Sequence, residues 1–437
     1  MTNTIYFRPD SEEDSENDDP SPEPETTRVN CFGYSVPSSS TKTAIKEEKD
    51  QAEEIECKKC KRILDVIENG NRYQNQKRID DNQDYLLGMP RRRTNSRVSK
   101  NVTNGLHGEQ VAAGWPIWLV SIASEAIYGW TPRAAHTFEK LHQISRGARS
   151  TEYKAKDNLT SKIVALKKVQ IDRSDSVSLR SMARQLIIMR RLDHHPNVIK
   201  LEGLVVSSKN KKCYELHLVF EHMEHDLSEL ATGGGTKLTE TQVKSSMLQL
   251  LSGLEHCHSL GVLHRNLNGS NLLLDNKGIL KIAGFGSASF FDPNNKKPMS
   301  NRVANLWYRA PELILGATDY GVGIDLWSTG CVLGELLTGE PIMTGSTQVE
   351  QLHQIFKLCG SPSEAYWRTA NLLHKSLFMP QYPYKRCIVE TFKTCPPASL
   401  QLMEILLAID PFERQTATAL LKIEFLSDRP SLMHSEA

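Results

Sequence analysis

The sequence predicts an α+β protein of two lobes, in which a small sheet-rich half precedes a larger helical half. Between residues 138 and 220, apolar side chains alternate in short strand-like runs that are interrupted by one helical stretch around 176–192. Beyond residue 225 the apolar residues recur at helical spacing, as in Glu240–Leu260. We therefore expect a sheet with one main helix, followed by a lobe built mainly from helices.

The composition excludes several classes of protein. The 437 residues carry 53 Lys and Arg against 52 Asp and Glu, and this formal net charge of +1 argues against a strongly basic nucleic-acid binder. No apolar run reaches the roughly 18 residues that a membrane-spanning helix needs. The nine scattered cysteines do not resemble a disulfide framework. We expect an intracellular protein with no membrane partner.

Residues 1–105 are expected to form a disordered extension. Nine Asp or Glu residues lie between Asp10 and Glu25, and few apolar residues are present to offset the entropy lost on ordering. The extension ends in a basic cluster from Arg91 to Lys100, which is interpreted as a solvated linker, a nuclear address or a phosphate-contacting patch. The location is therefore nucleus or cytoplasm, with the nucleus slightly favoured.

Two short motifs in this extension carry weak signals. Cys57-Lys-Lys-Cys60 is a single CxxC pair, whereas a structural zinc needs four ligands and no second pair follows at a suitable spacing. Arg62-Ile63-Leu64 has the form of a docking tripeptide, but three-residue matches are common by chance. Neither motif supports a specific function.

The composition changes from about Val111, where a folded region begins. Trp115-Pro-Ile-Trp-Leu-Val120 is a compact apolar cluster that is too short for a membrane and is expected to pack on the domain that follows. The expected organisation is a strap over 106–137, a small lobe over 138–221, a large lobe over 225–426 and a tail over 427–437.

Four motifs in a fixed order narrow the fold. They are Val164-Ala-Leu-Lys167, His264-Arg-Asn-Leu-Asn-Gly-Ser-Asn271, Gly284-Phe-Gly286 and Arg309-Ala-Pro-Glu312. With these motifs the chain resembles the eukaryotic protein kinases over residues 138–426. The resemblance implies a bilobal protein-kinase fold with an antiparallel sheet in the first lobe, and transfer of the ATP γ-phosphate to serine or threonine.

Further motifs resemble one branch of that family. Leu306-Trp-Tyr-Arg309, Gly316-Ala-Thr-Asp-Tyr320 and Asp325-Leu-Trp-Ser328 are similar to segments of the cyclin-dependent kinases. The leader Trp115–Trp130 resembles a plant subgroup with long N-terminal extensions. The resemblance implies a cyclin-like partner that is received by the helix at Ser176–Leu192.

The resemblance also places the nucleotide site. The family covers the phosphates with a glycine-rich lid, which corresponds to Ile144–Glu152 here. Gly147 of the lid is kept, but Glu152 is found where the family usually has valine. A carboxylate at this position would be desolvated or would face the triphosphate, unless it swings outward to solvent. Lys167 is the lysine that contacts the α- and β-phosphates in the family. The remaining nucleotide-contacting positions are Ile144, Ala165, Glu221, Met223 and Leu273.

The resemblance implies that five positions lack the residue with which the family carries out phosphoryl transfer. Asn266 replaces the aspartate base, and an amide cannot take a proton near neutral pH. Gly284 replaces the metal-binding aspartate, which leaves Asn271 as the remaining metal-ligand position. Gln185 replaces the glutamate that pairs with the nucleotide-site lysine. The other two replacements are Asn268 for a lysine and Asn305 for a threonine.

Positions that hold the family's scaffold are kept. These are His264, Phe285, Glu312, Asp325 and Arg414. Arg265 is also kept, and Ser300 aligns with the activating phosphosite, so that a phosphate there would form charge-assisted hydrogen bonds with the arginine.

We therefore expect a catalytically inactive member of the cyclin-dependent-kinase-like branch, with weak or absent binding of ATP and Mg²⁺. Such a protein would act as a scaffold, decoy or allosteric partner of kinases or substrates. One alternative is a weak serine/threonine kinase that uses Lys167, Asn271 and a recruited carboxylate, either Asp275 or Asp292. A second alternative is a nucleic-acid adaptor that binds through Arg91–Lys100.

Overall fold

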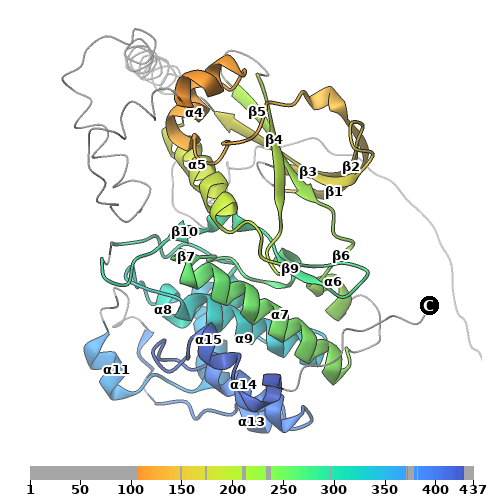
Figure 1. The fold of residues 1–437 in the computed structure, drawn as a ribbon. Coiled ribbons are helices and arrows are strands. Elements are labelled where there is room, and N and C mark those ends of the chain that lie inside the picture. Colours follow the sequence, from red (N-terminus) through yellow and green to blue (C-terminus); the bar gives the residue numbers. More distant parts are fainter. Residues whose placement is uncertain are drawn as a thin grey trace, which may run out of the picture. The chain divides into compact units, whose positions relative to one another are not determined.

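The computed structural model describes residues 106–427, apart from 148–149, 173–174, 209–212, 233–237, 296, 371, 373–377 and 381. Within this part the chain forms a sheet-rich lobe above a helical lobe (Figure 1). This order confirms the predicted α+β architecture. The predicted disordered extension, its CxxC pair, its docking tripeptide and its basic cluster all lie outside the described residues, as does the tail beyond Ser427.

The small lobe is built on one antiparallel sheet of five strands in the order β1-β2-β3-β5-β4. The strands are β1 (Phe138–Arg146), β2 (Ser150–Asp157), β3 (Ile163–Asp172), β4 (Leu201–Ser208) and β5 (Cys213–Glu221). Successive side chains of a strand point to opposite faces. On β3, Val164 and Leu166 are buried in a small outer core with Val219, so Ala165 and Lys167 face the opposite side.

One main helix, α5 (Ser176–Arg191), packs against this sheet, as the sequence predicted. Asp175 caps its start, because the carboxylate accepts hydrogen bonds from the backbone N–H groups of Val177 at 3.0 Å and Ser178 at 3.1 Å. The buried residues of α5 lie mainly in its second half, at Met182, Ala183 and 186–189. This half faces the core, and the first turn remains exposed.

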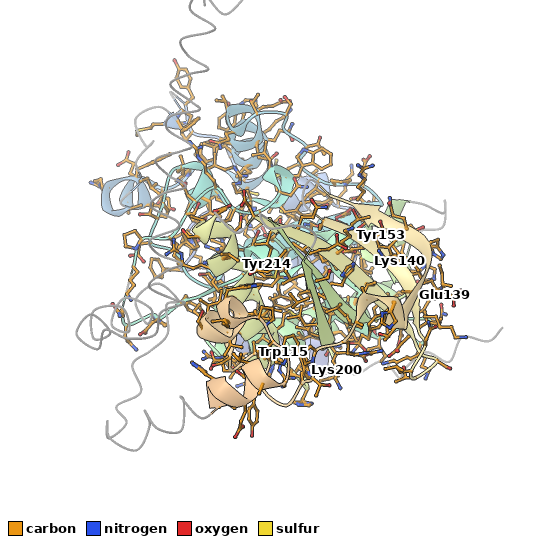
Figure 2. All side chains as sticks on the ribbon, turned by 90° about the horizontal axis from the view of Figure 1, so that it is seen from above. Trp115, Glu139, Lys140, Tyr153, Lys200 and Tyr214 are labelled. Atoms are coloured by element: carbon orange, nitrogen blue, oxygen red, sulfur yellow. The ribbon has the colours of Figure 1, made fainter. Side chains whose placement is uncertain are left out.

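The strap is part of the small lobe. Its helix α4 (Ile117–Ala123) lies beside α5 in Figure 1, and Trp115, Leu119 and Val120 are almost fully buried in the same core as α5. Figure 2, which views the molecule from above, shows Trp115 in the strap and Tyr214 on the side of the sheet that the strap covers. The folded region therefore begins before β1.

Aromatic side chains fix the strap in place. The Trp118 ring packs on Tyr214 of β5 with centroids 4.7 Å apart. The Trp130 ring lies 4.5 Å from the Arg190 guanidinium of α5, and the same guanidinium donates to the carbonyl of Tyr128 at 3.2 Å. Because the two contacts of Arg190 lie in the last turn of α5, the strap supports the C-terminal half of that helix.

Removal of the buried tryptophan is expected to cost much of the stability of the small lobe. Trp115→Ala should lower the free energy of unfolding by about 3–5 kcal/mol, because the side chain is large, buried and leaves a cavity. Urea unfolding would measure this loss. Ile117→Ala, in the same helix but with a side chain that is 54% exposed, is the matched control. Equal effects of the two substitutions would contradict the packing described here.

Helices form most of the large lobe, as the sequence predicted. The long helices are α7 (Glu240–Ser259), α9 (Gly323–Thr338), α10 (Gln348–Cys359) and α14 (Pro397–Leu406). Shorter helices are α6 (Leu227–Thr232), α8 (Pro311–Ile314), α11 (Glu364–Thr369), α13 (Ile388–Thr391), α15 (Ala417–Leu420) and α16 (Glu424–Ser427). The start of α7 is a capping box between Thr239 and Gln242. None of the helices that the structure describes is both long and apolar enough to cross a bilayer.

Short strands at the top of the large lobe position the site. Strands β6 (His225–Asp226), β8 (Leu272–Leu274) and β9 (Leu280–Ile282) form a three-stranded sheet, and β7 (Val262–Leu263) pairs with β10 (Ser289–Phe290). The motif from His264 to Asn271, which corresponds to the family's catalytic loop and is called the catalytic loop below, connects β7 to β8. The Gly284-Phe-Gly286 motif follows β9. The two motifs are therefore brought to the same edge of the lobe.

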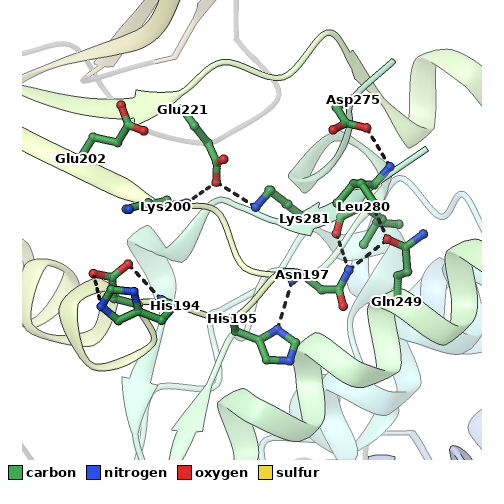
Figure 3. A network of polar contacts seen from close by, with 12 residues as sticks. His194, His195, Asn197, Lys200, Glu202, Glu221, Gln249, Asp275, Leu280 and Lys281 are labelled. Atoms are coloured by element: carbon green, nitrogen blue, oxygen red, sulfur yellow. Dashed lines mark hydrogen bonds and ion pairs between the residues drawn. The ribbon is translucent and has the colours of Figure 1, made fainter. Parts of the chain in front are cut away.

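A polar network joins the two lobes (Figure 3). The Glu221 carboxylate, at the end of β5, accepts from the backbone N–H of Lys200 at 2.8 Å and from Lys281 Nζ on β9 at 3.1 Å. The Asn197 side-chain amide donates to the carbonyl of Leu280 at 2.9 Å. These contacts bind the small lobe to strand β9 of the large one.

Candidate functional site

The catalytic-loop backbone is held by a buried carboxylate. Asp325 of α9 accepts from the backbone N–H groups of His264 at 2.9 Å and Arg265 at 2.8 Å, and from His258 Nε2 at 3.1 Å. Burial alone would raise the pKa of Asp325, but the hydrogen bond and charge of His258 lower it, so the pKa lies below its ordinary value. The loop is thus anchored to the central helix of the large lobe.

Three of the five replaced positions, Asn266, Asn268 and Asn305, come together here with the retained Asn271. The backbone carbonyl of Asn266 accepts from the side-chain amides of Asn271 at 2.9 Å and Asn268 at 3.2 Å. The Asn266 side-chain oxygen accepts from the backbone N–H of Asn305 at 3.1 Å. All four side chains are neutral amides, which neither gain nor lose a proton near neutral pH. These four side chains can form hydrogen bonds, but none of them can act as a general base.

The side chain of Asn271 fills the space beside Gly284. Gly284 has a positive φ of 80° and precedes η3 (Phe285–Ser287). A Cβ atom added at Gly284 would lie 2.1 Å from Asn271 Oδ1. The expected metal position therefore presents one neutral oxygen and no carboxylate, a donor set that does not suit Mg²⁺. Within the described ranges, no three His, Cys, Asp or Glu side chains are grouped to hold a metal ion.

Two charged residues of the predicted nucleotide site, Glu152 and Lys167, form an ion pair. Glu152 on β2 and Lys167 on β3 are direct partners in the strand register, and Lys167 Nζ lies 2.5 Å from Glu152 Oε1. The sequence left two orientations open for Glu152, toward the phosphates or out to solvent. The structure instead places its carboxylate on the lysine. The two side chains remain 31% and 27% exposed, respectively.

The expected helix partner of the lysine lies apart from this ion pair. Gln185 Oε1 is 3.9 Å from the position that a Cβ of Gly286 would take, and in the described part of the chain no hydrogen bond joins Gln185 to Lys167. The counter-charge of the lysine thus comes from the neighbouring strand and not from α5.

The other expected nucleotide positions lie on both lobes. Gly147 in the lid donates its N–H to the carbonyl of Ser150 at 2.8 Å, while Ala148 and Arg149 lie outside the described residues. Glu221 uses its carboxylate in the network between the lobes. The remaining positions are Ile144 on β1, Ala165 on β3, Met223 after β5 and Leu273 on β8.

The two residues predicted to be regulatory, Arg265 and Ser300, are linked through a tyrosine that the sequence analysis did not single out. Arg265 Nη1 donates to the Tyr320 hydroxyl at 3.2 Å, and that hydroxyl donates to the backbone carbonyl of Ser300 at 2.5 Å. Arg184 of α5 was also missed. Burial and the positive charge of Arg265 lower the pKa of Arg184, and its Nε donates to the carbonyl of Ala288 at 3.1 Å. One feature of the sequence could have identified Arg184: it directly precedes Gln185, the residue that aligns with the family's partner of Lys167.

The predicted partner surface on α5 is only partly accessible. The strap and the sheet bury its second half, but the first turn is exposed, and the Val177 side chain is 67% accessible to solvent. Ser176 and Arg180 are exposed beside it. Any protein that approaches this helix meets its N-terminal end.

The retained scaffold residues are buried and fully engaged. Arg414 forms two hydrogen bonds with the Glu312 carboxylate, at 2.7 Å and 2.9 Å, and both residues are buried. The His264 and Phe285 rings pack edge to face with centroids 4.8 Å apart. These contacts do not depend on catalysis.

Comparison with known proteins agrees with this geometry. The family model described as "Protein kinase domain" matches residues 138–426. A probable serine/threonine-protein kinase of Arabidopsis thaliana is 59% identical over 336 residues, which cover 77% of this chain and 58% of that protein. Cyclin-dependent kinase C-2 C of the same plant is 47% identical over 325 residues, which cover 74% of this chain and 50% of that protein.

A solved structure shares the fold. One chain in the crystal structure of the yeast RNA Pol II CTD kinase CTDK-1 complex is 33% identical, with a TM-score of 0.60, and the match covers 69% of this chain and 97% of that one. This chain spans about half the length of the curated relatives it matches. The chain belongs to the eukaryotic protein kinase family, in its cyclin-dependent-kinase-like branch.

Proposed function

We propose that this protein is a catalytically inactive cyclin-dependent-kinase-like protein that works by binding other proteins. The observation that carries the proposal is the pair of lost carboxylates, Asn266 at the base position and Gly284 at the metal position, with Asn271 filling the space between them. Loss of a general base alone costs about 10²–10⁴-fold in rate. Because the base and the metal ligand act together in one reaction, the loss of either one would nearly abolish phosphoryl transfer.

Weak binding of ATP and Mg²⁺ forms part of the proposal. The phosphate-contacting lysine, Lys167, is already neutralised by Glu152. The metal position offers the neutral oxygen of Asn271 without a carboxylate. A triphosphate would therefore share Lys167 with the Glu152 carboxylate and would lack the metal that normally neutralises the phosphate charge.

The contacts of the candidate replacement carboxylates argue against a weak kinase. Asp275 Oδ1 accepts from the backbone N–H groups of Lys277 at 2.9 Å and Ile279 at 2.8 Å, which fixes the turn between β8 and β9. Asp292 Oδ1 accepts from the backbone N–H of Asn294 at 2.9 Å. Both carboxylates stabilise local turns, and neither is hydrogen-bonded to the catalytic loop in the described part of the chain.

A cyclin-like protein is the partner we propose, with the chain acting as a scaffold between that partner and other kinases or substrates. Several relatives are named cyclin-dependent kinases. The exposed first turn of α5, centred on Val177, supplies an accessible apolar side chain next to the positive charge of Arg180. An apolar anchor with a charged neighbour suits a specific protein contact.

Val177→Asp is expected to weaken cyclin binding by about tenfold or more, because a buried, unpaired carboxylate at an interface is costly. Calorimetric titration of the full chain against a panel of purified plant cyclins would measure this change. Val349→Asp is the matched control, since that side chain is 62% exposed on α10 in the other lobe. If no cyclin binds, or if both variants lose affinity equally, this partner assignment is wrong.

A further inference from the structure

The segment that contains Ser300 is fixed mainly by hydrogen bonds from side chains. Residues 284–312, described apart from residue 296, correspond to the family's activation segment and are given that name below. Between β10 and η4 (Leu306–Tyr308) its described residues form neither helix nor strand. Without a helix or a ladder to pair them, the backbone N–H and C=O groups need other partners. The contacts of these groups therefore decide where the segment lies.

Four side chains donate hydrogen bonds to backbone carbonyl groups of the activation segment. They are Arg184 (to Ala288 at 3.1 Å), Arg265 (to Ser287 at 2.7 Å), Arg309 (to Val303 at 2.9 Å and Ala304 at 3.0 Å) and Tyr320 (to Ser300 at 2.5 Å). A backbone carbonyl is present whatever the side chain of its residue. The contact of Tyr320 would therefore remain if the side chain of Ser300 were replaced or modified.

Tyr320, which lies between α8 and α9, connects the segment to the catalytic loop. Its side chain is buried, and its hydroxyl accepts from Arg265 Nη1 at 3.2 Å while it donates to the Ser300 carbonyl. Burial raises the pKa of Tyr320, which keeps the hydroxyl protonated near neutral pH and able to donate. Two residues before the tyrosine, the carbonyl of Thr318 accepts from the backbone N–H of Met299 at 2.8 Å. The loop around Tyr320 thus holds two successive residues of the segment.

The two arginines that would receive a phosphate on Ser300 already have partners. In the described part of the chain, the buried Arg265 guanidinium reaches Ser300 through the Tyr320 hydroxyl, and Arg184 is bonded to a carbonyl of the same segment. The exposed Ser300 accepts with its own hydroxyl from the backbone N–H of Arg302 at 3.3 Å. A phosphate there would add charge to a segment whose backbone is already fixed.

We propose that Tyr320 is the residue that positions the activation segment, and that the segment keeps this conformation whether or not Ser300 carries a phosphate. A protein partner that contacts this surface would then find it in place without a preceding phosphorylation step. The inference goes beyond the proposed function, because it concerns the order of the segment and would hold for an active as well as an inactive chain.

Limited trypsin digestion of the full chain tests the inference, because Arg302 is an exposed cleavage site two residues after Ser300. Tyr320→Phe removes only the hydroxyl and should speed cleavage after Arg302 about tenfold, since the Ser300 carbonyl loses its donor and the segment opens more often. Cleavage after Arg368, whose side chain is 74% exposed on α11, reports on opening elsewhere in the lobe and should keep its rate.

Two changes at Ser300 itself test the second half of the proposal. Ser300→Ala, and a chain made with phosphoserine at position 300, should both be cleaved after Arg302 at the rate of the unmodified chain, because Tyr320 contacts the backbone. Tyr382→Phe is the control for the loss of a tyrosine hydroxyl, since that side chain is 82% exposed. It should leave both cleavage rates unchanged.

Three outcomes would overturn the inference. The first is cleavage of Tyr320→Phe after Arg302 at the wild-type rate. The second is an equal rise in cleavage after Arg302 and Arg368, which would show that the tyrosine stabilises the lobe as a whole and does not position the segment. The third is a phosphoserine chain that is clearly more resistant after Arg302 than the unmodified chain, which would show that the phosphate orders the segment.

Discussion

Phosphotransfer is expected to appear only when both lost carboxylates are restored together, in the variant Asn266→Asp/Gly284→Asp. The first substitution returns a base, which contributes about 10²–10⁴-fold to the rate. The second returns the carboxylate that Mg²⁺ prefers. Because each part is useless without the other, the single variants should stay at background. Transfer of labelled phosphate from ATP to a generic protein substrate would measure the rates.

The geometry adds a condition to this result. A side chain at Gly284 would overlap Asn271 Oδ1, so Asn271 must rotate and give up its hydrogen bond to the Asn266 carbonyl. The positive φ of 80° at Gly284 adds backbone strain. Gly284→Asp should therefore lower the free energy of unfolding by about 1–3 kcal/mol. Lys167→Ala in the double variant is the control and should abolish transfer. A single variant as active as the double one would refute this interpretation.

The second large effect concerns the retained scaffold. Arg414→Ala is expected to lower the free energy of unfolding by about 3–5 kcal/mol, because it leaves the buried Glu312 carboxylate without its partner. The two side chains share hydrogen bonds of 2.7 Å and 2.9 Å, and Arg414 also donates to the carbonyl of Gly323 at 3.0 Å. Chemical denaturation of the full chain would measure the loss.

An exposed ion pair gives the comparison for this substitution. Arg368 and Glu364 lie one helical turn apart on α11 with their charged atoms 3.9 Å apart, and both side chains are mostly exposed. Such surface pairs contribute little to stability. Arg368→Ala should therefore leave the unfolding midpoint unchanged. If Arg414→Ala were equally harmless, the scaffold would not be maintained by this pair.

Much of the fold could be predicted because the signals are local. Helix α7 follows from the apolar spacing of Glu240–Leu260, and its start coincides with a Thr239–Gln242 capping box. The absence of charge at Asn266 and Gly284 is a property of residue identity and needs no coordinates. These elements could therefore be predicted before the structure was known.

The rest depends on side-chain placement across the fold. The orientation of Glu152 is set by the register of β2 on β3, which periodicity alone does not determine. The contact of Asn271 with the space at Gly284 is a matter of rotamer and loop geometry. The link from Arg265 through Tyr320 to Ser300 joins residues that are far apart in the sequence. Sequence patterns carry no direct signal for such contacts.

A thermal melt of the full chain, alone and with ATP, each with and without Mg²⁺, tests most directly whether the framework is kept and the reaction chemistry is lost. A ligand at 100 times its Kd stabilises a protein by about 2.7 kcal/mol, which shifts the Tm of a domain of this size by roughly 2–4 °C or less. We predict no Mg²⁺-dependent shift, because Glu152 neutralises Lys167 and Gly284 offers no metal ligand. A shift that requires both ATP and Mg²⁺ would show that the site still assembles around the complete cosubstrate, and would contradict this account.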